Sequence, residues 1–182
     1  MRLQEGRVTD NGEMTLPFPS PTVSASGQTE VFVRYLDYFR ETVLSKVSAL
    51  PDGELRRSRL PSGWTPLELL KHLRYVELRW IEWGFQGVKV EEPWGDQRGD
   101  RWHVAPDETR DGLVAALRAQ GMLTATVVAS NELTTVGARG PRWDGAPPAP
   151  LERVLFHLLQ EYARHLGQLD IVAELAGGPV GE

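Results

Sequence analysis

The stretch Ser62-Gly-Trp-Thr-Pro-Leu-Glu-Leu-Leu-Lys-His72 contains the best-marked helix start in this chain. Thr65 is a good N-cap residue, Pro66 suits the first helical position, and Glu68 completes a capping box. Apolar residues then recur at steps of three and four positions, which predicts a helix as far as about Phe85. Its expected inward face consists of Leu69, His72, Leu73, Val76, Trp80 and Trp83. A histidine therefore interrupts an otherwise apolar face.

Three further stretches show the same helical periodicity. They cover about residues 29–50, 107–130 and 150–175. Pro51-Asp-Gly53 is expected to end the first of these helices, and Gly177-Gly-Pro179 the last. The sequence has no internal repeat, no sustained heptad and no alternating strand pattern. These features predict an all-α protein, a bundle of four helices.

Two long connections separate the predicted helices, at residues 86–106 and 131–150. The first is rich in Gly, Pro and Asp and contains Trp94, Trp102 and His103. A connection this long without a helix or strand is often functional. We therefore expect the first connection to shape the mouth of a pocket, with His103 exposed.

Composition restricts the class of protein. The chain has 182 residues, 41% of them hydrophobic, which suits one domain with a sizeable core. The net charge is −5 and the basic residues are scattered, which argues against a nucleic-acid partner. The absence of cysteine excludes disulfides, thiolate metal sites and a cysteine nucleophile. No apolar run approaches the roughly 20 residues of a membrane span, and the N-terminus lacks the apolar centre of a secretory signal. We expect no membrane association and a cytoplasmic protein.

The expected domain organisation is simple. Residues 1–27 are polar and then Pro-rich, which predicts an extended or flexible arm. Residues 28–176 form the bundle, and residues 177–182 form a flexible tail.

Three residues on inward faces indicate chemistry. Glu161 and His165 are four residues apart, so they are neighbours on one face of the last helix, and His72 lies on another helix. Ionisable side chains are rarely buried unless they are paired or bind a metal. Two histidines and a carboxylate form a common three-point site for a divalent metal, with positions left for water or substrate. Facing helices of a bundle typically assemble such sites.

The residues alone leave alternatives open. His157, Glu161 and His165 form a ladder whose two ends are about 12 Å apart along the helix, too far for one ion to bind both. Either His157 or His165 is then a ligand, and the other is not. A second helix must supply a further ligand, and His72 is the only histidine on another predicted helix. His72 could instead be a hydrogen-bonded core residue. Glu161 could be a buried acid paired with Arg153 or Arg164.

Two segments resemble the DinB-like superfamily. Ser62 to Leu73, followed by Val76-Glu77 and Trp80, is similar to the second helix of these proteins. Val154-Leu-Phe-His-Leu-Leu-Gln-Glu161-Tyr-Ala-Arg-His165-Leu-Gly-Gln-Leu-Asp170 is similar to their last helix. The match is best with the actinobacterial branch described as a domain of unknown function, and it covers about residues 28–176. The resemblance implies an up-down-down-up four-helix bundle that is frequently a homodimer.

The resemblance also implies a metal, usually zinc and in some members nickel. The ligands are one histidine of the second helix and two residues of the last helix. Many members carry His-x-x-x-His there, and Glu161 stands at the first of those positions. That departure resembles the metal-binding domain of mycothiol-dependent maleylpyruvate isomerases, which use a His-Glu-His set. The implied ligands are therefore His72, Glu161 and His165, and His157 lies one turn outside the motif.

Some members of the superfamily are thiol-dependent transferases or isomerases that use mycothiol or bacillithiol. We therefore expect a metal-dependent thiol S-transferase, or a related isomerase, with a low-molecular-weight thiol and an electrophile as substrates. A divalent metal lowers the pKa of a bound thiol, and a chain without cysteine needs a thiol from outside. Arg74, Arg79 and Arg164 are candidates for binding a carboxylate of the thiol. The alternatives are a metal-dependent hydrolase that uses activated water and a non-enzymatic metal-binding or stress-related bundle.

Overall fold

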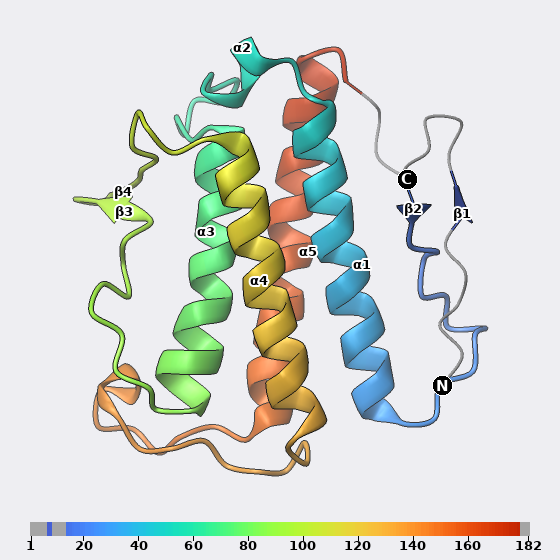
Figure 1. Ribbon diagram of the computed structural model, residues 1–182, viewed down its shortest axis with the longest axis vertical. Helices are drawn as coiled ribbons and strands as arrows, with labels where there is room; N and C mark the ends of the chain where they lie inside the picture. The colour runs from blue at the N-terminus through green and yellow to red at the C-terminus, as the bar shows by residue number, and fades with distance from the viewer. Residues whose placement is uncertain (1–6, 9–13, 179–182) are drawn as a thin grey trace.

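Four long helices form the body of the molecule (Figure 1) in the computed structural model, which describes residues 7–8 and 14–178. They are α1 (Gln28–Ala49), α3 (Pro66–Leu78), α4 (Arg110–Ala129) and α5 (Leu151–Leu175). A short helix, α2 (Asp52–Leu55), follows α1, and a 3-10 helix, η2 (Pro141–Trp143), precedes α5. The predicted four-helix bundle is confirmed. The parts of the predicted arm and tail at residues 1–6, 9–13 and 179–182 lie outside the described residues.

The bundle has the up-down-down-up order implied by the family resemblance. In Figure 1, α1 and α5 run upward, whereas α3 and α4 run downward. Helix α1 packs against α4 and α5, and α3 packs against the same two helices. Because α3 and α4 are parallel, the chain must return along the whole length of the bundle between them. That return places the first long connection beside α3.

Helix α3 begins as the sequence predicts. The hydroxyl of Thr65 accepts a hydrogen bond from the amide of Glu68, and the Glu68 carboxylate accepts one from the amide of Thr65 at 2.8 Å. This capping box satisfies two amides that have no partner within the helix. Pro66 occupies the first turn, where its missing N–H costs nothing.

The predicted inward face of this helix is partly wrong. After Leu78 the helix continues to Phe85 as a π-helix, η1 (Arg79–Phe85). The wider turn of a π-helix shifts the side chains that follow it relative to an α-helical spacing. Ile81 and Phe85 therefore enter the core, whereas Trp80 and Trp83 are only half-buried.

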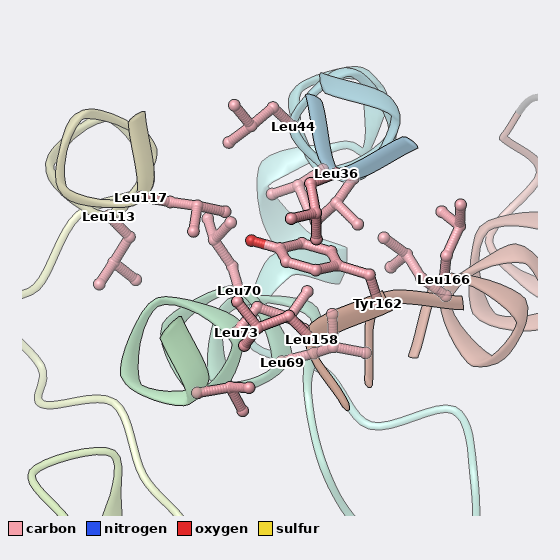
Figure 2. Packing of buried hydrophobic residues seen from close by; sticks show 14 of the residues in the cluster. Leu36, Leu44, Leu69, Leu70, Leu73, Leu113, Leu117, Leu158, Tyr162 and Leu166 are labelled. Atoms are coloured by element: carbon pink, nitrogen blue, oxygen red, sulfur yellow. The ribbon is translucent and has the colours of Figure 1, made fainter. Parts of the chain in front are cut away.

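Leucines from all four helices fill the core, and Tyr162 lies among them. Figure 2 shows its ring between Leu36 of α1 and Leu158 of α5. Tyr162 is fully buried, so it takes the inward position on this turn of α5, and Glu161, expected on the inward face, is 21% exposed.

A polar cluster joins the four helices inside this core. Glu77 of α3 is fully buried, and its carboxylate accepts hydrogen bonds from Arg40 of α1 at 3.0 Å, Thr124 of α4 at 2.5 Å and Tyr162 of α5 at 2.5 Å. Each helix thus contributes one member. Burial, followed by the charge of Glu77, raises the pKa of the Tyr162 hydroxyl well above its usual value. A buried carboxylate with this many partners is satisfied rather than reactive.

The first long connection contains a small hairpin that the sequence did not predict. Strand β3 (Gln97–Arg98) pairs antiparallel with β4 (Arg101–Trp102), and Gly99 in the turn has a φ of 62°. Figure 1 shows this hairpin at the side of α3. It places Trp102 against that helix.

The N-terminal segment contains a second small hairpin, β1 (Arg7–Val8) paired antiparallel with β2 (Met14–Thr15). Between this hairpin and α1, the ring of Phe18 packs edge-on against Tyr35 at 6.0 Å and Tyr38 at 5.3 Å. Phe18 of the predicted arm therefore packs on α1.

Helix α4 is long and apolar enough to span a membrane, judged by length and composition alone. Its most apolar window has a mean hydropathy of 1.4. No such segment was expected from the sequence. A core helix of a bundle passes the same test. Here the helix directs Leu113, Leu117 and Val127 into the core and Thr124 onto Glu77. Of the apolar window of α4, 39% is buried in the bundle.

Candidate metal centre

His72, Glu161 and His165 come together between α3 and α5, which lie side by side and antiparallel. The Nε2 atom of His165 is 3.2 Å from Oε2 of Glu161, and Nε2 of His72 is 4.0 Å from the same oxygen. One potential ligand atom from each residue lies within 4.8 Å of the others. The structure thus brings together the three residues that the sequence singled out.

The two histidines and the glutamate differ in burial. His72 and His165 are buried, whereas the side chain of Glu161 is 21% exposed. The next residue, Tyr162, points into the core, so Glu161 lies at the edge of the bundle. The centre is therefore open to solvent on the Glu161 side.

Both histidines use their other ring nitrogen for a hydrogen bond. Nδ1 of His72 is 2.9 Å from a carboxylate oxygen of Asp96, and Nδ1 of His165 is 2.9 Å from the amide oxygen of Gln168. These oxygens accept, so each Nδ1 carries the proton and donates it. In the neutral imidazoles, each Nε2 then carries a lone pair directed at the carboxylate of Glu161. A cation between them would turn this repulsion into attraction, so the donor set suits a divalent metal.

Asp96 is the most important residue of the site that the sequence analysis missed. It lies in the first long connection, next to β3, and is 0% exposed. Arg79 donates to both of its oxygens, at 2.7 and 3.2 Å, and also to the carbonyl of Pro93 at 3.1 Å. Burial alone would raise the pKa of Asp96, but hydrogen bonds from His72 and Arg79 outweigh it and hold the pKa below its usual value. Asp96 is therefore an ionised carboxylate that orients His72.

Trp102 forms one wall of the centre. Its ring stacks on His72 at 4.1 Å with an angle of 21° between the planes, and it meets His165 edge-on at 5.2 Å. The first connection thus contributes a wall that contacts both histidines. Trp94 of the same connection lies farther out, over the guanidinium of Arg79 at 4.4 Å. His103 was expected to be exposed, but it is half-buried, because the connection packs against α3.

His157 contacts the carboxylate of Glu161 from the other side. Its Nε2 is 3.2 Å from Oε1 of Glu161, and its ring is 4.4 Å from Trp80. It does not join the group of three whose ligand atoms converge. The hydrogen bond from His157 is the largest cause that holds the pKa of Glu161 far below its usual range, so Glu161 is ionised. Glu161 makes these contacts and does not form the ion pair with Arg153 or Arg164 that was the alternative from sequence.

Comparison with known proteins identifies the family of the chain. A family model described as mycothiol-S-transferase matches residues 31–178. The chain belongs to the mycothiol-S-transferase family. No curated protein matches the sequence of this family member.

Solved structures show that this mycothiol-S-transferase family member has the DinB-like fold. A DinB-like protein from Bacillus cereus is 19% identical, with a TM-score of 0.59, and the alignment covers 84% of this chain and 95% of that one. A conserved protein from Enterococcus faecalis is 18% identical, with a TM-score of 0.56, and the alignment covers 85% of this chain and 100% of that one. At these identities the likeness concerns the fold, and the predicted DinB-like resemblance is confirmed.

The three arginines considered as thiol ligands in this mycothiol-S-transferase family member are not equivalent. Arg79 is buried and engaged by Asp96, so it supports the centre instead. Arg164 is exposed on α5. Arg74 is half-buried and lies over the ring of Tyr75 at 4.6 Å.

Two cavities meet at His157, one helical turn from Glu161. The proline–tryptophan cavity has a volume of about 450 Å³, and its lining includes Trp80, Trp143, Pro147, Pro148, Arg153 and His157. The α1–α5 cavity has a volume of about 530 Å³, and its lining includes Gln28, Phe32, Glu152, Arg153, His157 and Gln160. Both volumes lie in the range of small-molecule sites. Both cavities reach His157, whose Nε2 is 3.2 Å from the carboxylate of Glu161.

Proposed function

We propose that this chain is a divalent-metal-dependent thiol S-transferase that joins a mycothiol-type thiol to an electrophile. The metal ligands would be Nε2 of His72, the carboxylate of Glu161 and Nε2 of His165, with zinc the expected ion and nickel the alternative. The observation that carries the proposal is the convergence of three electron-rich atoms whose histidines already have their Nδ1 atoms hydrogen-bonded elsewhere. The family supports the thiol substrate.

A bound divalent metal lowers the pKa of a thiol and so supplies thiolate at neutral pH. The residues of the chain hold and shield the reacting groups. Asp96 and Gln168 orient the two imidazoles, and Trp102 covers His72. The partly exposed side of Glu161 leaves room for substrates to approach.

The proposed S-transfer needs only the thiol, the electrophile and water as reactants. The sulfur of the thiolate forms a bond to the electrophilic carbon, and the leaving group departs with the electron pair of its bond. If the electrophile is an activated double bond, the neighbouring carbon takes up a proton from water instead. The proton of the thiol leaves to solvent. The chain has no cysteine that could compete as nucleophile.

The test compares two identical substitutions on α5. Glu161→Gln removes the carboxylate of the proposed centre, whereas Glu174→Gln changes an exposed residue near the end of the same helix. We expect wild-type protein and Glu174→Gln to bind about one zinc ion per chain by elemental analysis and to conjugate mycothiol with a panel of electrophiles. Glu161→Gln should lose most of its zinc content and most of its conjugation activity. Its helix content by circular dichroism should equal that of the wild-type protein.

Each contrary outcome has a distinct meaning. Full zinc content in Glu161→Gln would contradict the ligand set. Absence of chelator-sensitive conjugation in wild-type protein would contradict the transferase proposal. Zinc-dependent ester or amide cleavage without any thiol would favour the hydrolase alternative, and zinc binding without turnover would favour the non-enzymatic one. The homodimer and the cytoplasmic location stay predictions, to be checked by light scattering and cell fractionation.

A further inference from the structure

The proline–tryptophan cavity has a lining of unusual rigidity. Trp80 is held by the ring of Trp143 at 6.1 Å and by the guanidinium of Arg142 at 3.9 Å. The indole N–H of Trp143 donates to the carbonyl of Ala138 at 2.9 Å. Proline side chains form much of the remaining wall. Rings and prolines lose little conformational entropy when a ligand binds, so the cavity is preorganised for an apolar group.

This cavity also carries one charge suited to a ligand. Arg153, which also lines the α1–α5 cavity, is exposed at the edge of the proline–tryptophan cavity and forms no ion pair with a residue in the described part of the chain. A guanidinium in that position favours an anionic substituent on the ligand. An aromatic wall with a single cation at its rim is complementary to a flat ring that bears a negative group.

The cavity connects with the candidate metal centre through one side chain. The ring of His157 lies 4.4 Å from Trp80 in the cavity, and its Nε2 lies 3.2 Å from the carboxylate of Glu161. Four residues of helix correspond to about 6 Å. A molecule whose ring lies in this cavity beside His157 would therefore have its near end within about one helical turn of Glu161.

The second cavity at His157 differs in polarity. Gln28, Glu152 and Gln160 border it with amide and carboxylate groups, and Gln28 donates to Glu152 at 2.7 Å. Such a lining suits a polar, hydroxyl-rich thiol such as mycothiol better than an apolar ring. Phe32 and Phe156 add apolar surface to the second cavity, and the two cavities share Arg153 and His157, so they differ in the amide and carboxylate groups of the second and the prolines and tryptophans of the first.

We propose that the proline–tryptophan cavity binds the electrophile, and that the electrophile is a flat, apolar, ring-bearing molecule with an anionic substituent facing Arg153. This inference rests on the proposed S-transferase function. It identifies the class of the second substrate, and it makes Trp80, Trp143 and Arg153 specificity residues that do not bind the metal.

The binding test uses zinc-loaded full-length protein and two unreactive probes, naphthalene-2-sulfonate and its neutral analogue 2-naphthol, measured by calorimetry. Trp143→Ala should weaken the binding of both probes about tenfold, because each loses a stacking partner. Arg153→Gln should weaken only the sulfonate, several-fold. Phe18→Ala removes an exposed ring that packs on α1 and should change neither affinity.

The kinetic test uses mycothiol with 1-chloro-2,4-dinitrobenzene and, as a small electrophile, iodoacetamide. Trp143→Ala should raise KM for the aryl chloride about tenfold and leave KM for mycothiol and for iodoacetamide unchanged. If Trp143→Ala does not fold, Ala149→Leu fills the same cavity while keeping both tryptophans. Ala149→Leu should likewise weaken the aryl probes and spare iodoacetamide.

The outcomes separate this inference from the function on which it rests. Equal affinity of both probes in wild type, Trp143→Ala and Arg153→Gln would overturn the cavity assignment, whatever the turnover. A raised KM for mycothiol in Trp143→Ala would overturn it as well, because the cavity would then hold the thiol. Probe binding that Trp143→Ala weakens, in a protein without any thiol conjugation, would support the ring-binding cavity and overturn the transferase proposal alone.

Discussion

The histidines of the candidate metal centre owe their orientation to residues that would not touch the ion. Asp96 accepts a hydrogen bond from Nδ1 of His72, and Arg79 in turn donates to both oxygens of Asp96. A hydrogen-bonded carboxylate makes an imidazole a better ligand and keeps it in one tautomer. Gln168 does the same for His165 with a neutral oxygen. The orientation and the metal affinity of His72 should therefore depend more strongly on Asp96 than those of His165 depend on Gln168.

Replacing Asp96 tests this dependence. Asp96→Asn keeps the shape of the side chain but removes the charge that faces His72 and Arg79. We expect zinc affinity to fall about 10- to 100-fold. The measurement is a competition titration with a chromophoric chelator.

Asp100 provides the matched control for that substitution. It lies in the turn of the same hairpin and is exposed. Asp100→Asn should leave zinc affinity unchanged. Equal affinity of wild type and Asp96→Asn would show that the hydrogen bond to Asp96 does not support the centre.

Among the helices, the contact between α1 and α4 depends on a glycine. Gly121 lies in the middle of α4, where glycine lowers helix propensity. A Cβ atom there would lie 2.5 Å from Nε of Arg40. Arg40 cannot swing away, because Glu77 and Asp37 hold its guanidinium. The glycine makes room for the buried arginine of the polar cluster.

Gly121→Ala is therefore expected to destabilise the protein by up to about 2 kcal/mol, because overpacking costs about 1–3 kcal/mol and the gain in helix propensity offsets about 1 kcal/mol of it. Urea denaturation measures the change in the free energy of unfolding. Gly167→Ala on α5 is the control, since a Cβ there meets nothing within 4 Å. It should stabilise the protein by up to about 1 kcal/mol. Equal stabilisation by both substitutions would mean that Arg40 does not lie over Gly121.

In the molecule as a whole, the metal centre and the core are separate. The leucine core and the Glu77 cluster hold the four helices together, whereas Glu161 lies at the edge of the bundle. Three protein ligands leave a site open, unlike the closed sites of structural zinc. The bundle should therefore stay folded when the metal is removed.

Chelation provides the corresponding prediction. With EDTA, the helical circular dichroism signal at 25 °C should not change. The melting temperature should fall by about 5–10 °C relative to protein with zinc at about 100 times its dissociation constant, because the ligand binds only the folded state. Loss of the helical signal on chelation would instead assign the metal a structural role.

The four helices and the pairing of Glu161 with His165 could be predicted because they depend on short-range order. Periodicity of 3.6 residues, a capping box and a spacing of four positions all act within a few residues of the chain. The role of His72 was harder to predict, because the residues alone left it open whether this histidine was a metal ligand or a hydrogen-bonded core residue. The family resemblance selected it, and the fold places it 4.0 Å from Glu161.

The remaining features arise from contacts between residues far apart in the chain. Asp96 reaches His72 across 24 positions, and Tyr162 reaches Glu77 across 85. A local pattern carries no signal for such pairs, because an acid in a loop and an acid in a helix look the same whether they are buried or exposed. The π-helical turn that moves Trp80 from the core to a cavity wall is likewise set by packing. Periodicity thus specified the helices and one face of the site, whereas the return of the chain along α3 and the packing of α3 on α5 created its geometry.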